Sequence, residues 1–223
     1  AAEPAMGSSH GAYNVDSRMP RTERVTSRVI VYRSIDSTNI EAGRLLQDGT
    51  LQLNDDSVVA IAADTQSAGR GRLDHAWVSR PGESFAVTFV TAVPRWLALD
   101  ASVNGWLQMI AGLAAVDGLR GAMRECGAQS IATVNDDADG AGFMLKWPND
   151  VFLGGHKLGG ILSQMVSLPV GSMTEGYNDD NKGADRIAIS FGIGLNLAIP
   201  AEHLPTLQST SLQLYYAPLP DAE

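Results

Sequence analysis

The chain has 223 residues, of which 44% are hydrophobic, so it is long enough for one large soluble domain with a sizeable core. Its formal net charge of −9 argues against a general nucleic-acid-binding surface, because such a surface needs clustered cations. The sequence has no apolar run of about eighteen residues, its first residues lack the apolar segment of a signal peptide, and Cys126 is its single cysteine. We therefore expect a cytoplasmic protein without a signal peptide, a membrane span or an internal disulfide.

The first part of the chain predicts a tail, a strand, a helix and a second strand. Residues 1–24 lack apolar periodicity and contain several Gly and Pro residues, so we expect a flexible tail. Residues 25–32 end in a β-branched run that is typical of a buried strand. Ser37 can cap a helix that runs to about Gly49, and residues 58–63 predict a short, continuously apolar strand.

The start of the predicted helix is unusually polar. Ser37, Thr38 and Asn39 stand where the backbone N–H groups of the first helical turn lack intrahelical partners. Such a turn suits an anionic or carbonyl-bearing ligand. These residues can act only as helix caps or can also bind a ligand, and the helix by itself leaves both interpretations open.

A glycine- and arginine-rich loop is expected after the second strand. It begins near Gln66, contains Gly-Arg-Gly-Arg at residues 69–72, and ends at Trp77. Glycine lets the backbone curl, and a guanidinium group can bind phosphate or carboxylate through two parallel hydrogen bonds. We therefore expect a loop that is mobile when empty and binds an anion, with a basic surface loop as the alternative.

The middle of the chain predicts core elements and not a site. Residues 85–93 predict a strand that ends at Pro94, and residues 101–126 predict a long amphipathic helix in which Gly118 is a candidate break. Residues 127–142 predict an acidic turn, because a calcium loop would need a fuller ligand pattern and a terminal Glu.

Residues 143–162 contain the densest group of unusual residues. An apolar run leads to Lys146, Pro148 interrupts regular pairing, and residues 151–153 predict a second short strand. The Gly-Gly step at residues 154–155 signals a two-residue hairpin, and a second Gly-Gly step at residues 159–160 indicates a close approach by a ligand or another strand.

This hairpin can direct several polar side chains into one pocket. The side chains are those of Lys146, Asn149, Asp150 and Lys157. The alternative is an ordinary hairpin whose lysines are solvated.

The last predicted strand covers residues 186–196 and follows a loose, Gly-, Asn- and Asp-rich connection at residues 168–185. Its alternation places four large apolar residues on one side, namely Ile187, Ile189, Phe191 and Ile193. Gly192 and Gly194 open the other side to a ligand, and Asn196 is expected at the edge of the pocket.

Five segments, in order, resemble signatures of the biotin protein ligases over roughly residues 25–200. They are Ser37-Thr38-Asn39, the loop at residues 66–77, Lys-Trp-Pro-Asn-Asp at 146–150, Lys-Leu-Gly-Gly-Ile-Leu at 157–162, and Gly-Ile-Gly-Leu-Asn at 192–196. The chain departs from the family pattern at Leu73, Asp74 and His75, where the family often has further Arg and Gly residues. This departure puts extra arginine contacts to the adenylate in doubt.

The resemblance implies an α+β fold with a mainly antiparallel mixed sheet flanked by helices, similar to the class II aminoacyl-tRNA synthetases. It implies a catalytic domain over residues 25–212, followed by a C-terminal extension over residues 213–223. We expect neither the N-terminal helix-turn-helix DNA-binding domain that some family members carry nor the small C-terminal β-barrel domain that the family usually has.

The resemblance also implies a function. The family uses ATP and Mg²⁺ to activate biotin as biotinyl-5′-AMP and transfers biotin to a lysine of a biotin carboxyl carrier domain. The expected partner is therefore the carrier domain of a biotin-dependent carboxylase, with no nucleic acid and no membrane, and a homodimer stays open. The alternatives are a lipoate or octanoate ligase or transferase, and a non-catalytic biotin sensor.

Individual roles follow from the same resemblance. Lys157, Arg70 and Arg72 are the expected catalytic residues, because cations between two anionic substrates offset their repulsion. The expected biotin-binding residues are Ser37, Thr38, Asn39, Gln66, Gly69, Arg70, Lys157, Gly159 and Gly160. The expected nucleotide-binding residues are Arg72, Trp77, Lys146, Asn149, Asp150 and Asn196. Asp150 is a candidate Mg²⁺ ligand or orients a lysine, and both roles stay open.

Overall fold

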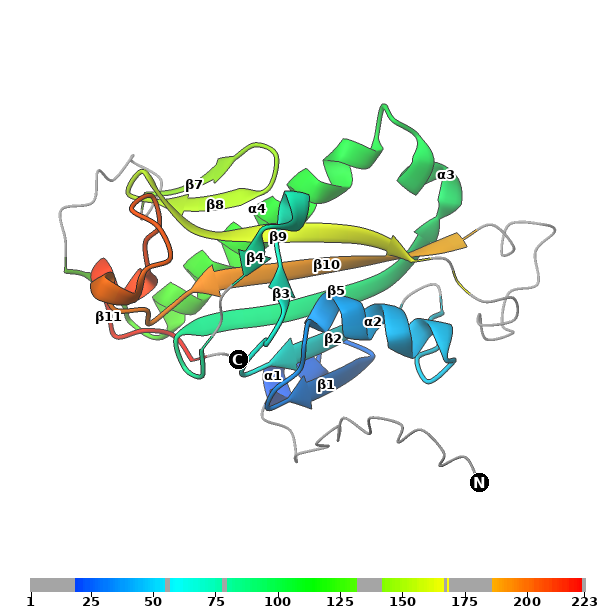
Figure 1. The fold of residues 1–223 in the computed structure, drawn as a ribbon, viewed down its shortest axis with the longest axis horizontal. Helices are drawn as coiled ribbons and strands as arrows, with labels where there is room; N and C mark the ends of the chain where they lie inside the picture. The colour runs from blue at the N-terminus through cyan, green and yellow to red at the C-terminus, as the bar shows by residue number, and fades with distance from the viewer. Residues whose placement is uncertain are drawn as a thin grey trace, which may run out of the picture.

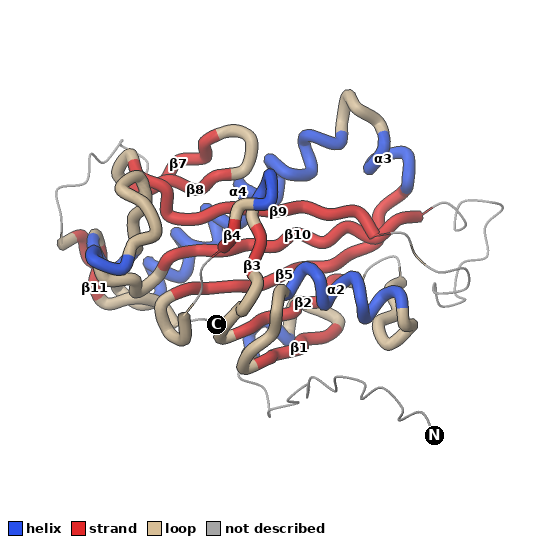
Figure 2. Tube along the Cα trace, in the orientation of Figure 1, coloured by secondary structure: helices blue, strands red, loops and turns tan. Residues whose placement is uncertain are grey.

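A computed structural model describes residues 19–54, 57–77, 80–131, 142–166, 168 and 186–221. A seven-stranded sheet, in the order β1-β2-β5-β10-β9-β8-β7, forms the centre of the molecule (Figures 1 and 2). Within this sheet β1 and β2 are parallel, and the other neighbouring strands are antiparallel. The predicted mixed, mainly antiparallel sheet is confirmed.

The first part of the chain builds one half of the sheet and the helix on its front face. The bounds are β1 (Arg28–Tyr32), α2 (Thr38–Gln47), β2 (Val58–Ala63), β3 (Gly69–Arg70), β4 (Ala76–Trp77) and β5 (Ser84–Pro94). The predicted strands, the predicted helix and the strand end at Pro94 are confirmed. The two-residue strands β3 and β4 pair with each other within the glycine- and arginine-rich segment.

The second part adds the long helix and the remaining strands. The bounds are α3 (Arg95–Leu99), α4 (Asn104–Glu125), β6 (Gln129–Ser130), β7 (Phe143–Lys146), β8 (Asp150–Leu153), β9 (His156–Val166), β10 (Arg186–Asn196) and β11 (Tyr216–Ala217). The long helix continues through Gly118, so the candidate break does not occur, and α3 was not predicted. The predicted hairpin is confirmed, because Gly154 and Gly155 have φ values of 58° and 82° at its turn.

Alternation along β10 separates the two faces of the sheet. Ala188 belongs to the apolar cluster that contains Leu46 of α2. Ile189 packs with Ala98 of α3, and Leu195 belongs to the cluster formed with α4. Figure 1 accordingly shows α2 in front of the sheet and α4 behind it, so glycines on the α2 side of β10 leave room on the front face.

The predicted tail over residues 1–24 is wrong for residues 19–24. Met19 is buried among apolar residues of β2 and β5, and Pro20–Glu23 form helix α1. Arg21 Nη1 also lies 2.7 Å from Glu125 Oε2 at the end of α4. Residues 1–18 lie outside the described residues, as do most of the predicted acidic turn and of the connection at 168–185.

The segment after residue 212 packs into the apolar cluster formed with α4. Tyr216 of β11 is buried and stacks on Phe143, with 6.1 Å between the ring centroids. Among the described residues, no helix combines the length and the apolar character needed to cross a membrane.

Candidate functional site

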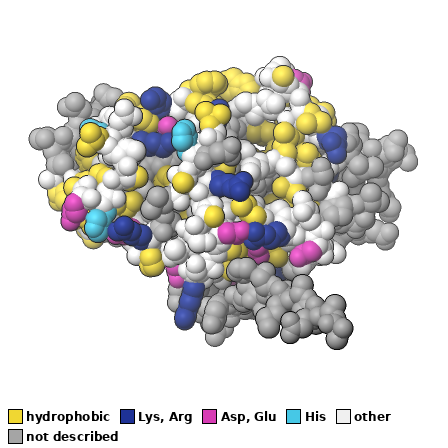
Figure 3. Space-filling view, in the orientation of Figure 1, with side chains coloured by type: hydrophobic (Ala, Val, Ile, Leu, Met, Phe, Trp, Pro, Cys, Tyr) yellow, Lys and Arg dark blue, Asp and Glu magenta, His cyan; other side chains and the backbone are white. Residues whose placement is uncertain are grey.

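A cavity of about 570 Å³ opens on the α2 side of the sheet, between the N-terminus of α2, the β3–β4 segment and the hairpin that joins β7 and β8. Its floor includes Gly160 and Leu162 of β9 and Gly192 and Gly194 of β10. Figure 3 shows this face with Lys and Arg side chains spread among apolar and neutral ones. The cavity therefore lies where segments far apart in the sequence meet.

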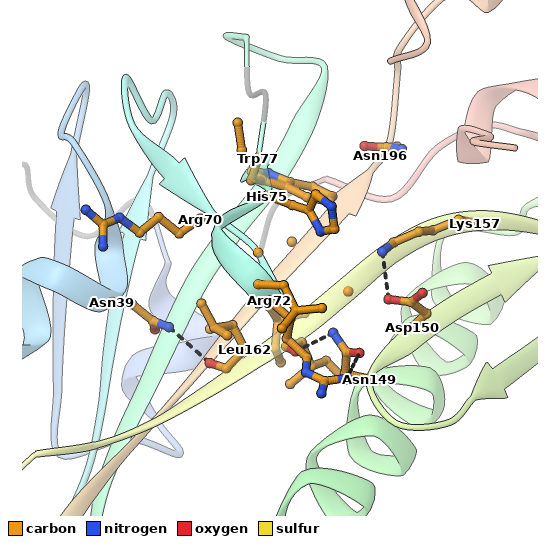
Figure 4. A pocket seen from close by; sticks show the side chains of 18 of the residues that line it. Asn39, Arg70, Arg72, His75, Trp77, Asn149, Asp150, Lys157, Leu162 and Asn196 are labelled. Atoms are coloured by element: carbon orange, nitrogen blue, oxygen red, sulfur yellow. Dashed lines mark hydrogen bonds and ion pairs between the residues drawn. The ribbon is translucent and has the colours of Figure 1, made fainter. Parts of the chain in front are cut away.

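One end of the cavity carries uncharged hydrogen-bonding groups. The Thr38 backbone N–H donates to Gln66 Oε1 at 2.8 Å, and the Thr38 hydroxyl lies 3.2 Å from the same oxygen. Asn39 Nδ2 donates to the Leu162 carbonyl oxygen at 3.0 Å, as Figure 4 shows. Because each of these groups is fixed by the protein, this end of the cavity is pre-organised for a neutral polar ligand group.

An ion pair outside the cavity fixes the start of α2. Asp36 accepts a hydrogen bond from the Ser37 backbone N–H at 2.7 Å and pairs with Arg44 in the second turn of the helix. The hydrogen bond from Arg44 is the largest cause that lowers the pKa of Asp36 below its usual range, against the effect of burial. The same helix is held from β1, where the Tyr32 hydroxyl donates to Glu41 Oε1 at 2.7 Å. Burial and this hydrogen bond raise the pKa of Tyr32.

The opposite end of the cavity is charged. Lys157 Nζ lies 2.7 Å from Asp150 Oδ1, and both side chains remain partly exposed to the cavity. Arg72 Nη1 donates to Asn149 Oδ1 at 3.3 Å, while Asn149 Nδ2 donates to the Ile161 carbonyl oxygen at 3.1 Å. Two cations thus lie at one end, one of them paired with a carboxylate and the other with an amide (Figure 4).

A β-bulge aims Lys157 into the cavity. Val151 pairs with Gly159 but Phe152 pairs with Lys157, so β9 has one extra residue at this point. Without the bulge, Lys157 and Gly160 would project to opposite faces, because their positions differ by an odd number. The bulge brings both to the cavity side, where both line the cavity.

The β3–β4 segment forms one wall of the cavity. Trp77 lies against Gly194, since a Cβ added at Gly194 would be 2.7 Å from Trp77 Cε2. The buried Trp77 Nε1 has no hydrogen-bond partner among the described residues. Arg70 also lines the cavity, although Figure 4 shows its side chain extending away from Lys157.

Nearly all the predicted site residues line this one cavity. Those that do are Ser37, Thr38, Asn39, Gln66, Arg70, Arg72, Trp77, Lys146, Asn149, Asp150, Lys157, Gly160 and Asn196. Lys146 Nζ lies 5.1 Å from the centroid of the Phe152 ring, and Asn196 Nδ2 donates to the Thr210 carbonyl oxygen at 2.9 Å.

Gly69 and Gly159, two of the predicted biotin-binding residues, are not among the residues that line the cavity. A Cβ at Gly159 would lie 2.1 Å from the Gly194 carbonyl oxygen, because this residue faces the backbone of β10. A Cβ at Gly69 would lie 2.7 Å from the Trp77 carbonyl oxygen. Both glycines permit close packing of backbone segments and do not provide room for a ligand.

Several lining residues were not among the predicted site residues. Pro205, Thr206 and Ser209 come from a segment that runs beside Lys157, whose backbone N–H donates to the Gln208 carbonyl oxygen at 2.8 Å. His75 and Trp147 also line the cavity. The segment at 205–209 has no periodicity that could have placed it there, whereas His75 and Trp147 lie inside motifs that the sequence did single out.

The described residues do not form a dedicated metal site. No group of three or more His, Cys, Asp or Glu residues in the described ranges is arranged to hold a metal ion. Asp150, the candidate Mg²⁺ ligand, is paired with Lys157. Mg²⁺ commonly binds proteins through one or two carboxylates together with substrate phosphates, and the present donor set does not form a site without such phosphates.

Sequence comparisons connect the chain to known ligases. A family model described as "Biotin/lipoate A/B protein ligase family" matches residues 31–175. The biotin--[acetyl-CoA-carboxylase] ligase of Paracoccus denitrificans is 35% identical over 163 residues, which cover 73% of this chain and 52% of that protein. The protein of the same name from Mycobacterium tuberculosis is 34% identical over 108 residues, which cover 48% of this chain and 35% of that protein. The chain thus spans about half the length of these relatives, or less.

Two solved structures share the fold. The biotin protein ligase of Leishmania major in complex with biotinyl-5-AMP has a TM-score of 0.53 at 21% identity, covering 84% of this chain and 64% of that one. The same protein in complex with biotin has a TM-score of 0.51 at 24% identity, covering 84% of this chain and 62% of that one. The predicted class II synthetase-like fold is confirmed.

Proposed function

Because this chain belongs to the biotin/lipoate A/B protein ligase family, we propose that it is an ATP-dependent biotin protein ligase. It would activate biotin as biotinyl-5′-AMP and transfer the biotinyl group to a lysine of a biotin carboxyl carrier domain. The proposal extends to this chain the activity stated in the names of its relatives from Paracoccus denitrificans and Mycobacterium tuberculosis.

The observation that carries the proposal is the contrast between the two ends of the cavity. At the uncharged end, Gln66 Oε1 accepts from the Thr38 backbone, so Gln66 Nε2 is left to donate to a ligand carbonyl. The oxygens of Thr38 and Asn39 can accept from ligand N–H groups. A cyclic urea offers one carbonyl between two N–H groups, which matches this arrangement. The charged end then faces the valerate carboxylate and the nucleotide phosphates.

In the first reaction, a carboxylate oxygen of biotin attacks the α-phosphorus of ATP, the bond to the bridging oxygen breaks, and pyrophosphate leaves. Lys157 would lie at this junction and offset the repulsion between the two anions. Arg72, held by Asn149, would bind the phosphate side. Asp150 is the candidate protein ligand for Mg²⁺, which, when bound, would supply positive charge against the nucleotide phosphates.

In the second reaction, the amine of a carrier lysine attacks the acyl carbon of the mixed anhydride. The bond between that carbon and the AMP oxygen breaks, AMP leaves, and the nitrogen loses a proton to form the amide. Trp77 and the rest of the β3–β4 segment would keep water away from the anhydride during this step.

A lipoate or octanoate ligase is the second candidate, because the same family description includes lipoate ligases. The hydrocarbon chain of octanoate and the dithiolane ring of lipoate carry no N–H group. Neither would use the acceptors at the uncharged end, so the polar lining favours biotin.

The test is incubation of the chain with ATP, labelled biotin and a biotin carboxyl carrier domain. We expect pyrophosphate release that depends on biotin, followed by label on the carrier. Pyrophosphate release with octanoate or lipoate but not with biotin would instead support the second candidate. Biotin binding without pyrophosphate release would identify a sensor and contradict the proposal.

A further inference from the structure

A hydroxyl group buried beneath the cavity contacts both residues that form its uncharged end. Thr88 of β5 is fully buried, at 0% exposure, and is absent from the cavity lining. Its Oγ1 atom lies 2.7 Å from Thr38 Oγ1 and 2.8 Å from Asn39 Oδ1. Thr88 therefore lies one contact away from any ligand held by these two residues.

The number of available protons limits how these groups can bond. Asn39 Nδ2 donates to the Leu162 carbonyl oxygen, so Asn39 Oδ1 must face Thr88. The Asn39 amide oxygen carries no proton, and the Thr38 oxygen accepts from Thr88 through a lone pair. The single hydroxyl proton of Thr88 is therefore shared between these two acceptors. Among the described residues, no other side chain donates to Asn39 Oδ1.

The proton of Thr38 is also directed toward the protein. The Thr38 hydroxyl donates to Gln66 Oε1 at 3.2 Å. With Thr88 on one side and Gln66 on the other, Thr38 keeps a lone pair, and not a proton, for a ligand. The same holds for Asn39 Oδ1, whose second lone pair is not used by Thr88.

We propose that Thr88 is a positioning residue that sets the hydrogen-bond polarity of the uncharged end. By donating to Thr38 and Asn39, it holds both as acceptors and so selects a substrate that brings N–H groups. The substrate class selected is a cyclic urea over a plain acyl chain. This inference rests on the proposed function and adds a specificity determinant that does not itself touch the substrate.

The experiment compares four single variants of the full chain. Thr88→Val removes the hydroxyl and keeps the shape, while Thr88→Ser keeps the hydroxyl. Thr88→Ala is the partner of Thr88→Ser, because these two differ mainly by the hydroxyl. Thr91→Val is the matched control on the same strand, since it removes a hydroxyl that donates to the Ser57 carbonyl oxygen at 2.8 Å outside the cavity.

Biotin affinity is measured by calorimetry, and the kcat and KM for biotin by pyrophosphate release. We expect the Kd and KM of Thr88→Val and Thr88→Ala to rise about tenfold, the scale for one hydrogen bond lost in a buried polar network. The kcat at saturating biotin should stay within about twofold, because the charged end is untouched. Thr88→Ser and Thr91→Val should resemble the wild type.

The outcomes separate this inference from the function on which it rests. If the wild type fails to bind biotin, the proposed function and the inference both fall. If the wild type binds biotin and Thr88→Val binds it equally well, the inference alone is overturned. Equal losses of biotin affinity in Thr88→Ser and Thr88→Ala would also overturn the inference, since packing and not the hydroxyl would then be responsible for the loss. That pair of variants carries the test if Thr88→Val does not fold, as judged by circular dichroism.

Discussion

Lys157 is held at the charged end of the cavity by its ion pair with Asp150, 2.7 Å from Nζ to Oδ1. We expect Lys157→Met to slow adenylate formation about 10²-fold, because it removes a preorganised cation from the place where charge moves in the reaction. Pyrophosphate release at saturating ATP and biotin measures this rate. Arg124→Met, on an exposed position of α4 outside the cavity lining, is the control. A near-normal rate in a folded Lys157→Met variant would remove Lys157 from the mechanism.

Gly192, on the floor of the cavity, lies against Asn39. A Cβ at Gly192 would lie 2.6 Å from Asn39 Oδ1, so Gly192→Ala must displace this side chain. We expect biotin affinity measured by calorimetry to fall about tenfold, since the displaced amide loses the geometry of its buried hydrogen bonds. Gly118→Ala on α4 is the matched control, because no atom beyond its chain neighbours and the backbone of its own helix lies within 4 Å of the added Cβ. Unchanged affinity in Gly192→Ala would show that Asn39 does not hold the ligand.

At the scale of the element, the start of α2 depends on the Asp36–Arg44 ion pair. The pKa of Asp36 is lower in the folded protein than in the unfolded chain, where an aspartate titrates at about 3.9. Asp36 therefore contributes stability above that pH, and this contribution is lost as the pH falls through the folded-state pKa. We expect Asp36→Asn to lower the Tm by about 2 °C at pH 7, a value discounted for solvent screening. The difference in Tm between the wild type and Asp36→Asn should decrease as the pH falls below about 4. A difference that is the same at every pH would exclude the carboxylate as its source.

The β3–β4 segment forms a wall of the cavity through few contacts. Gly69 pairs with Trp77 and Arg70 pairs with Ala76, while Arg72 reaches Asn149 by one hydrogen bond. We expect amide hydrogen exchange at residues 69–77 to slow by about tenfold or more when biotin and ATP are both bound, because a ligand would supply the contacts that the segment lacks. Residues 58–63 of β2 serve as the internal reference. Equal exchange with and without ligands would reject closure of this segment.

At the scale of the whole molecule, β9 and β10 pair up to Val166, the last residue of β9, which lies opposite Ala188, the third residue of β10. The chain between them lies largely outside the described residues. Because the paired ends can be joined by a hairpin, we expect replacement of residues 171–184 by a short Gly/Asn turn to leave adenylate formation within about twofold of the wild type. Pyrophosphate release measures this step, and labelling of the carrier measures the second.

The two rates distinguish the possible results of that replacement. Loss of adenylate formation would show that the segment supports the cavity and contradict the prediction. Loss of transfer alone would indicate that Asp179 and Asp180 take part in docking of the carrier, since acidic groups steer a partner through complementary charge. The double variant Asp179→Asn/Asp180→Asn then isolates the charge from the length of the segment.

The sequence by itself determined most strands and the residues around which the cavity forms. The alternation in residues 186–196 places Ile189 and Gly192 on opposite faces, and the Gly-Gly step at 154–155 sets the hairpin. Both signals are local, because side-chain direction alternates along a strand and a tight turn demands particular residues. For the same reason the polar start of α2 and the basic loop could be singled out, although not placed beside each other.

Only the tertiary structure decided which of these residues share a wall and which support it. Gly159 and Gly160 form one glycine pair in the sequence, yet Gly160 lines the cavity and Gly159 packs against the backbone of β10, while a bulge beside them turns Lys157 to the cavity. Thr88 has the sequence environment of any core strand residue, and its role follows from a contact with α2 across the sheet face. Such facts depend on register and on the packing of distant segments, which no local pattern of residue types encodes.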